Sequence, residues 1–211
     1  MMKSLKSSVV AAVLSVSAVQ VANANLIVNG GFEEPGVEGV GFVSPANLPG
    51  WDASGTVELW NRTIGSQPTG PAPFEGDQYL ELNSTGSGPY SIFQSFSSVV
   101  GTIYEVTFAH SARRNTTPAE EFSLYLGDDA GNGQTNNIVN GPQGSWSTAT
   151  FNFMATSETS KLQFSAINPF SGTVGNFLDG VKVTDVPEPG TLALLGLGLL
   201  GLGGARRRMK P

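Results

Sequence analysis

Short runs in which apolar and polar residues alternate fill the middle of this 211-residue chain. In the run DQYLELN, Leu80 and Leu82 point to one side of an extended chain, whereas Tyr79 and Glu81 point to the other. Alternation with a period of two is typical of half-buried antiparallel strands, and Gly, Pro and Asn residues separate one run from the next. The same pattern occurs in five further runs, TIYEVTFAH (102–110), EFSLYL (121–126), ATFNFMA (149–155), KLQFSA (161–166) and FLDGVKV (177–183).

Because helical periodicity is almost absent, residues 25–185 are predicted to form one all-β domain. About eight to ten antiparallel strands in one domain imply a β-sandwich, most simply a jelly roll. The turn-rich stretches are predicted to be loops, and long loops on a rigid sandwich commonly carry binding sites. These loops are residues 36–50, 61–76, 115–119 and 128–144.

Residues 1–24 have the layout of a secretory signal peptide. Two lysines precede a short apolar stretch, and the small residues Ala22 and Ala24 fit the small-x-small cleavage rule. We therefore predict that signal peptidase removes this segment and that the mature protein begins at Asn25.

Residues 186–211 have a different layout, in which a short proline-rich sequence precedes an apolar run and a basic cluster. The run, residues 191–205, holds fifteen residues without charge. As a helix it would reach about 22 Å, which is less than the roughly 30 Å of a bilayer's hydrocarbon core. It would therefore span the inner membrane only with local thinning of the bilayer or adjustment of the flanking residues, with the arginines on the cytoplasmic side. The alternative, a helix buried in the domain, fits a sandwich poorly because the run is apolar on all sides. The residues that define this layout are Pro187, Glu188, Pro189, Arg206, Arg207 and Arg208.

Charge and cysteine content exclude several classes of function. Between the two ends, as far as Glu188, five basic residues stand against seventeen acidic ones, a net charge of −12. A body this acidic repels nucleic acid, so we expect no DNA or RNA partner. The chain has no cysteine, which removes thiol catalysis and zinc sites of the thiolate kind.

The residues give little support for catalysis, and we predict that the protein is not an enzyme. His110 is the only histidine, and its position in the alternation predicts a buried imidazole rather than a catalytic base. No G-x-S-x-G sequence occurs, so a serine hydrolase of that type is unsupported. A glycosidase that uses two carboxylates remains open because seventeen acids offer many pairs, although nothing singles out one pair.

Two kinds of residue are candidates for contact with a sugar. Trp60 leads into a predicted loop and could stack on a sugar ring, although most tryptophans in a sandwich pack in the core or at its rim. Arg113 and Arg114 follow a predicted strand and could bind an acidic sugar or a phosphate. Their alternative role is to balance the charge of the neighbouring acidic residues 120 and 121.

Two further polar residues, Glu81 and Gln94, are predicted to lie on exposed strand faces, where they could bond to sugar hydroxyls. Most residues of this kind only face water.

The order Pro-Glu-Pro, apolar run and arginine cluster at the C-terminus resembles the PEP-CTERM sorting signal of Gram-negative bacteria. The resemblance covers about the last 25 residues, those of the tail described above. It implies recognition by an exosortase, which would cut near the Pro-Glu-Pro sequence and release the body or pass it to another anchor. It also implies a link to exopolysaccharide and biofilm matrix.

The body resembles the galactose-binding-like jelly-roll domains of the choice-of-anchor C type, to which plant cell-wall proteins with a domain of unknown function are related. The segments that carry the resemblance are NLIVNGGFEEP, LPGW, VELWN, GDQYLELN, SIFQSF, YEVTFAHSARR, WSTATFNFMAT and FLDGVKV, in that order. The resemblance implies a lectin-like or matrix-binding sandwich without a known activity. It also implies that Glu33 and Asp179, which follow the NGGF sequence and lie in the last strand, share one structural calcium; the alternative is two solvated acids.

We therefore expect a protein that is secreted across the inner membrane to the cell surface or extracellular matrix of a Gram-negative bacterium. Its jelly roll is predicted to bind exopolysaccharide weakly, through Trp60 and the region of Arg113 and Arg114. Two alternatives stay open: a purely structural matrix protein without glycan binding, and a glycoside hydrolase or lyase.

Overall fold

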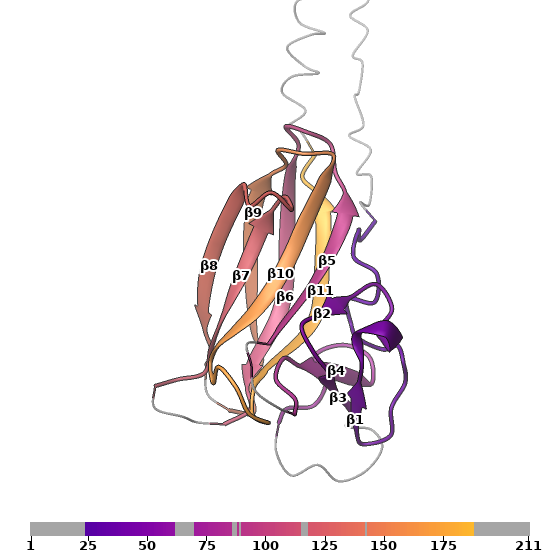
Figure 1. The fold of residues 1–211 in the computed structure, drawn as a ribbon, viewed down its shortest axis with the longest axis vertical. Helices are drawn as coiled ribbons and strands as arrows, with labels where there is room; N and C mark the ends of the chain where they lie inside the picture. The colour runs from indigo at the N-terminus through magenta and orange to yellow at the C-terminus, as the bar shows by residue number, and fades with distance from the viewer. Residues whose placement is uncertain are drawn as a thin grey trace, which may run out of the picture. The chain divides into compact units, whose positions relative to one another are not determined.

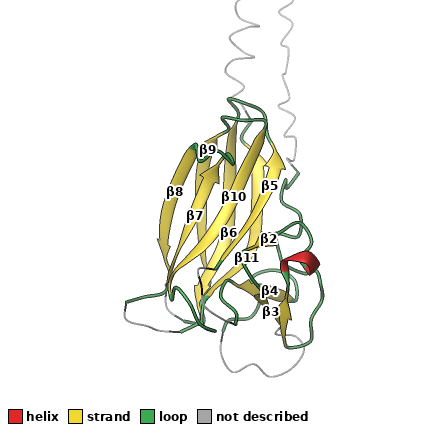
Figure 2. Ribbon diagram, in the orientation of Figure 1, coloured by secondary structure: helices red, strands yellow, loops and turns green. Residues whose placement is uncertain are grey.

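The computed structural model describes residues 24–61, 70–85, 88, 90–114, 118–141 and 143–187. Their strands form two antiparallel sheets that face each other, and a short 3-10 helix, η1 (Pro45–Asn47), lies between β1 and β2 (Figures 1 and 2). The six-stranded sheet has the order β1-β3-β4-β11-β6-β9. Its strands are β1 (Val40–Val43), β3 (Val57–Asn61), β4 (Gln78–Glu81), β11 (Asn176–Asp185), β6 (Ile103–Ala112) and β9 (Ser147–Met154).

The five-stranded sheet has the order β2-β5-β10-β7-β8. Its strands are β2 (Asp52–Ala53), β5 (Ser91–Ser97), β10 (Thr159–Asn168), β7 (Glu121–Gly127) and β8 (Gly133–Val139). The predicted antiparallel sandwich is confirmed, with eleven strands in the described part of the chain rather than eight to ten.

The alternating residues pack as the sequence predicts on the side between the sheets. Leu80 of β4, Leu82 just after that strand, and Leu124, Leu162 and Phe164 of the other sheet belong to one buried cluster. Removing such side chains from water is the main source of stability in a domain of this size. This buried cluster is the core of the domain, and it forms in a chain that has no cysteine and hence no disulfide.

Two predicted loops contain strands instead. β8 lies inside the stretch 128–144, and β1 lies inside the stretch 36–50. In β8, which is the last strand at one edge of its sheet, only Ile138 is buried. Because water reaches most of its side chains, the strand has no alternation that could have revealed it.

The tail and most of the signal peptide lie outside the described residues. These include Ala22, Glu188, Pro189, Arg206, Arg207 and Arg208, whereas Ala24 and Pro187 are the two ends of the described part. Within that part, no helix has both the length and the apolar character that crossing a bilayer needs. Residues Asn23–Val186 form one compact unit, and all the described strands belong to it.

Candidate functional site

The outer face of the six-stranded sheet is closed around β3 and β4. Every residue of these two strands is buried. Trp60 and Tyr79 stack with ring centroids 6.3 Å apart, and the ring of Phe177 from β11 lies 5.3 Å from that of Trp60. These three side chains make a second buried cluster, separate from the core between the sheets.

The expectation that Trp60 stacks on a sugar is therefore wrong for this structure, because its side chain is only 2% exposed. Its indole N–H donates to the carboxylate of Glu58 at 3.2 Å, and the guanidinium of Arg113 lies 4.9 Å from the ring centroid. The indole is thus engaged inside the protein. The two other tryptophans donate to backbone carbonyls, Trp51 to that of Asn29 at 3.0 Å and Trp146 to that of Ala72 at 2.6 Å.

Glu81 does not lie on an exposed face as predicted, since it is 0% exposed. It lies opposite Glu58 across β3 and β4, and Arg113 bonds to both of its oxygens at 2.9 and 3.0 Å. The loop before β11 covers it, because the amide of Gly175 donates to Glu81 at 2.6 Å and Arg113 also donates to the carbonyl of Thr173. We call Glu58, Glu81 and Arg113 the buried charge cluster.

The buried charge cluster holds two carboxyl groups and one guanidinium. Burial raises the pKa of Glu81 well above its usual value, the charge of Arg113 lowers it and the neighbouring Glu58 raises it further. Burial also raises the pKa of Glu58. This is a carboxylate pair of the kind that a glycosidase needs, but both groups are enclosed. A sugar cannot reach them in this conformation.

The two other predicted polar ligands also have structural partners. Gln94 is buried, and its amide makes a pair of hydrogen bonds with the backbone of Val28, at 2.8 and 3.0 Å. Glu120, the predicted partner of the arginine charges, accepts the backbone N–H groups of Arg113 and Arg114 at 2.8 and 2.9 Å. Burial raises the pKa of Glu120, whereas these bonds and the charges of the two arginines lower it. Of the five predicted ligand residues, Arg114 alone is exposed.

His110 is buried as the sequence predicts. Its Nδ1 lies 2.6 Å from the side-chain oxygen of Asn140, whose amide in turn donates to Asn176. Burial lowers the pKa of His110, so the ring is neutral at pH 7. This network ties β6 to β11 and is closed to a substrate.

The outer face of the five-stranded sheet is open and polar. A shallow depression of about 320 Å³ crosses β8, β7 and β10 and reaches the loop between β7 and β8. Its floor is formed by the residues that alternate with the core, and the loop forms its rim. The lining comprises Ser123, Tyr125, Asp128, Asp129, Gly131, Thr135, Lys161, Gln163 and Ser165.

The side chains of this depression are held in place by contacts with each other. The hydroxyl of Tyr125 donates to the carbonyl of Asp128 at 2.6 Å. Lys161 lies 3.6 Å from the carboxylate of Asp129 and 4.3 Å from the ring centroid of Phe93, which stands beside it on β5. Gln163 donates to the hydroxyl of Ser165 at 3.0 Å. Hydroxyls, amides and flanking rings on a rigid sheet are groups that bond and stack with sugars.

The sequence carries a partial signal for this face. The alternation in 121–126 and 161–166 places Ser123, Tyr125, Lys161 and Gln163 opposite the core residues. Recognising them as one surface requires the strand order β5-β10-β7-β8, which joins segments far apart in the sequence.

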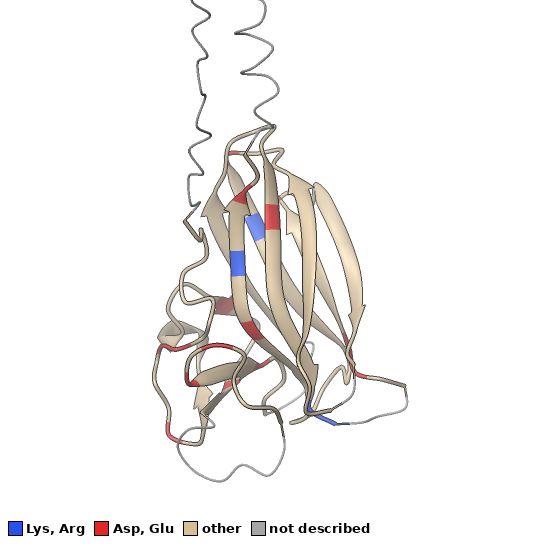
Figure 3. Cartoon of the chain, turned by 180° about the vertical axis from the view of Figure 1, so that it is seen from behind, with Lys and Arg blue, Asp and Glu red and all other residues tan. Residues whose placement is uncertain are grey.

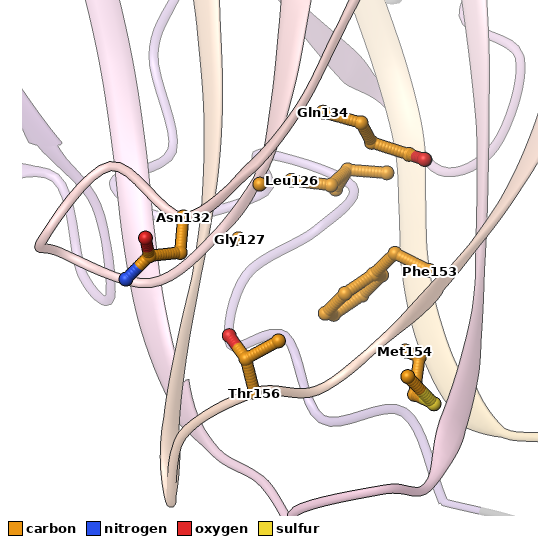
Figure 4. A pocket seen from close by; sticks show the side chains of 8 residues that line it. Leu126, Gly127, Asn132, Gln134, Phe153, Met154 and Thr156 are labelled. Atoms are coloured by element: carbon orange, nitrogen blue, oxygen red, sulfur yellow. The ribbon is translucent and has the colours of Figure 1, made fainter.

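A second hollow, of about 290 Å³, lies between the β7–β8 hairpin and the end of β9. Figure 4 shows Leu126, Phe153 and Met154 among its labelled side chains, with Gln134 and Asn132 on the hairpin. Gln134 crosses to β9, where it donates to the carbonyl of Asn152 at 3.0 Å. The hollow thus has a mixed lining, with the apolar side chains of Leu126, Phe153 and Met154 beside the polar ones of Asn132, Gln134 and Thr156.

The two predicted calcium ligands lie against one short segment, residues 74–78. Asp179 is 0% exposed and accepts the N–H groups of Phe74, Glu75 and Gly180 at 2.7 to 3.1 Å. Burial raises the pKa of Asp179 to about 7, although these bonds lower it. Glu33 accepts the N–H groups of the next two residues of the segment, 77 and 78, at 3.0 and 3.2 Å.

The fit of this pair to calcium is partial. The donors are oxygens, which calcium prefers, and a carboxylate offers about four lone-pair sites, so each acid retains capacity beyond its N–H bonds. A Cβ on Gly76 would lie 2.1 Å from Glu33, so glycine is required for this close approach. Among the described residues, no group of three or more His, Asp or Glu side chains is arranged to hold a metal.

Comparisons with known proteins agree with this fold. The family model described as "Protein of unknown function (DUF642)" matches residues 25–184, and the PEP-CTERM protein-sorting motif matches residues 185–208. Among curated proteins, halomucin of Haloquadratum walsbyi (strain DSM 16790 / HBSQ001) is 26% identical over 183 residues, 85% of this chain. Those residues are only 2% of halomucin, so the chain spans a very small part of that relative.

Among solved structures, TmCBM61 in complex with beta-1,4-galactotriose has a TM-score of 0.50 and 15% identity, over 77% of this chain and 99% of the other. The arabinose-bound α-L-arabinofuranosidase MgGH51 also has a TM-score of 0.50, with 13% identity over 77% of this chain and 26% of the other. Identities this low establish the fold alone. The fold is the jelly roll of carbohydrate-binding modules.

Proposed function

Since the chain belongs to the DUF642 family and ends in a PEP-CTERM protein-sorting motif, we propose that it is a surface or matrix protein that binds polysaccharide without catalysis. The motif implies export to the cell envelope or surface of a Gram-negative bacterium and processing by an exosortase. We further propose that the exosortase cuts the chain near Pro187 and that the released body is delivered to the extracellular matrix. Signal peptidase and exosortase are its processing partners, and the inner membrane holds it briefly.

The binding surface of this proposal is the open face of the five-stranded sheet. The observation that carries it is the depression formed by Tyr125, Lys161 and Gln163, where rings and hydrogen-bonding groups stand together on rigid strands. This surface replaces Trp60 and Arg113, which are occupied in the interior. Lectin-like binding is supported by the jelly-roll fold that the chain shares with a carbohydrate-binding module.

The charge of the body favours a neutral polysaccharide over an acidic one. Acidic residues outnumber basic ones on the described strands and loops (Figure 3). In the depression itself Lys161 stands near Asp128 and Asp129. A polyanion would therefore meet like charge on approach, and salt would screen that repulsion.

A pull-down with the organism's exopolysaccharide tests the binding step. We expect Gln163→Ala to weaken retention about tenfold, since losing its bonds to the sugar corresponds to roughly 1.4 kcal/mol. Gln134→Ala is the matched control, because Gln134 lies on β8 but bonds towards β9, away from the depression. Equal retention of the two variants and the unchanged protein would instead favour a purely structural matrix protein.

Intact-mass measurement of the exported protein tests the processing step. We expect a species that begins at Asn25 and ends near Pro187. A mature mass that still includes Arg208 would contradict exosortase processing.

Structural calcium between Glu33 and Asp179 is a further part of the proposal. The support is the buried Asp179 carboxylate, whose raised pKa reflects incomplete compensation of its charge and which a cation would stabilise. Chelation by EDTA is expected to lower the Tm of the wild type and to leave Tm unchanged in Glu33→Gln. An unchanged wild-type Tm would contradict the proposed calcium site.

A glycoside hydrolase is the competing proposal, and it rests on Glu58 and Glu81. Their enclosure argues against it, because a general acid and its partner must reach the glycosidic oxygen and the sugar. Release of reducing sugars from the exopolysaccharide, abolished in Glu81→Gln, would establish the hydrolase instead.

A further inference from the structure

Exposed apolar side chains gather at one end of the described unit. Ten large apolar residues of the described part are exposed, and half of them belong to this end. The β5–β6 turn supplies two of them, the start of β6 and the end of β9 one each, and the residues after β11 supply the fifth (Figure 1). We call these residues the apolar tip: Val99, Val100, Ile103, Met154 and Val186.

The backbone holds the members of the apolar tip together. Ile103 and Met154 are directly opposite each other across β6 and β9. The amide of Val186 donates to the carbonyl of Ile103 at 2.8 Å, so the end of the body is fastened to the same place. The turn 99–102 closes through the bond from Thr102 to Val99 at 3.0 Å.

The apolar side chains of the tip point outward for a specific local reason. Gly101 has a φ of +86°, which a glycine adopts without strain, and this sharp turn leaves Val99 and Val100 at its apex. Its amide also donates to the carbonyl of Ala155 at 2.8 Å, which joins the β5–β6 turn to the β9–β10 turn. The two protruding valines therefore lie on a turn that hydrogen bonds hold in place.

The sorting tail begins where the apolar tip ends. Only residues 187–190 separate Val186 from the uncharged run that starts at Thr191. The five Cα–Cα steps from Val186 to Thr191 span at most about 18 Å when fully extended. If the run enters a bilayer, the tip must stay within that reach of the point of entry.

Because the uncharged run is short, the tip should lie even closer to the membrane than the length of the connecting residues requires. Fifteen residues reach about 22 Å as a helix, against roughly 30 Å of hydrocarbon. A segment that is too short draws its flanking residues towards the membrane or thins the bilayer. The side chains of the apolar tip are the first part of the body that would be drawn to the membrane surface.

We propose that the apolar tip rests in the interfacial layer of the membrane while the tail is inserted, and so holds the Pro-Glu-Pro sequence at the membrane surface. This inference rests on the membrane step of the proposed function. Valine, isoleucine and methionine gain free energy when they enter the boundary between headgroups and acyl chains. Acidic residues lie close to the tip in the sequence: Glu105 on β6, Glu158 in the β9–β10 turn and Asp185 beside Val186. They favour a zwitterionic surface over an anionic one.

Because the chain has no cysteine, one introduced cysteine can carry a fluorophore that reports on its surroundings. Val100→Cys places the fluorophore on the tip, and Val139→Cys is the matched control. Both valines are 59% exposed, but Val139 pairs with Glu121 at the opposite end of the five-stranded sheet. Leu197→Cys, in the uncharged run, reports whether the tail has inserted.

The full chain would be reconstituted in phosphatidylcholine vesicles that contain a lipid-bound quencher in the upper acyl region. We expect the fluorescence at positions 197 and 100 to fall by about half or more and that at position 139 to stay unchanged, since an interfacial group lies about 5–10 Å deep. Phosphatidylglycerol vesicles are expected to quench position 100 less.

The other outcomes overturn the inference in distinguishable ways. Quenching at position 197 without quenching at position 100 would show that the tail is inserted but that the tip does not enter the bilayer. No quenching at any position removes the membrane step of the proposed function as well. Energy transfer between copies labelled at position 100, without lipid quenching, would make the tip a contact between two copies of the chain.

Discussion

The two outer faces of this sandwich both carry polar residues, but those of one face are buried and those of the other are accessible to water. On the six-stranded sheet, Glu58 and Glu81 are covered by loops and paired with Arg113 inside the protein. On the five-stranded sheet, Lys161 and Gln163 remain within reach of water. The difference teaches that loop cover and bulky strand side chains such as Trp60 together decide which face can bind a ligand.

Burial also changes what a charge costs. An enclosed carboxylate must be compensated by a guanidinium or by hydrogen bonds, or its pKa rises. Arg113 and the amide of Gly175 compensate Glu81 only in part, since burial still raises its pKa well above the usual value. The open face needs no such compensation, since water solvates its groups. The closed face is therefore expected to govern stability and the open face to govern binding.

The largest expected effect separates the aromatic residues of the two faces. Trp60→Ala removes a buried indole and is expected to lower the free energy of unfolding by about 3–5 kcal/mol. Phe93→Ala, on the open face, is expected to lower it by about 1 kcal/mol or less. Urea denaturation of the exported protein measures both values. Similar losses for the two variants would show that the faces do not differ as described.

The two neighbouring arginines offer a matched pair. Arg113→Ala leaves two buried carboxyl groups without their guanidinium, so we expect a loss of about 3 kcal/mol. The exposed side chain of Arg114 is expected to contribute within about 0.5 kcal/mol when replaced by alanine. If the two variants unfold at the same urea concentration, Arg113 is not the partner that the buried charge cluster requires.

The pH dependence of stability should reveal buried carboxylates. Asp179 has a folded pKa of about 7 against a usual value of 3.8, so the folded state holds its proton longer than the unfolded state does. Stability is therefore fully present below pH ~4 and is lost as pH rises towards ~7, with a slope of up to about 1.4 kcal/mol per unit. Glu58 and Glu81, whose pKa values are also raised, act in the same direction.

Asp179→Asn is expected to flatten that slope in urea denaturation between pH 4 and 7 without added calcium. Asp128→Asn is the control, since hydrogen bonds from Asn132 lower the pKa of Asp128 and confine its effect to more acidic solutions. A slope that persists in Asp179→Asn would assign the dependence to other carboxyl groups.

A small effect is also expected for a hydroxyl on the open face itself. Tyr125→Phe removes the hydroxyl that bonds to the carbonyl of Asp128 but keeps the ring. We expect a loss of about 1 kcal/mol or less in unfolding free energy, since solvent can replace a bond at the surface. A loss comparable to that of Trp60→Ala would indicate that the face is structurally closed.

Sequence reasoning recovered the layer architecture because alternation is a local property. Leu80, Val106 and Phe164 lie in the core between the sheets as their spacing predicts. It missed β8, which alternates too little because water reaches most of its side chains. It also predicted the wrong environment for Glu81, whose burial depends on a loop more than 90 positions away, at Gly175.

The candidate site was beyond sequence reasoning for the same reason. Tyr125 and Gln163 could be identified as outward-facing residues, but their adjacency depends on the register between β7 and β10. The pairing of Arg113 with Glu81 likewise depends on the order β4-β11-β6. Local pattern predicts which side of a strand a residue faces, whereas strand order and loop cover decide what that side meets.

The most direct test of which face binds is a map of backbone amide chemical shifts in the exported protein as its own exopolysaccharide is added. The account predicts that the changes concentrate at Ser123, Tyr125 and Gln163 and their neighbours on β7 and β10, while the amides of Trp60 and Glu81 stay in place. Changes centred on β3 and β4, or no change at saturating polysaccharide, would contradict it.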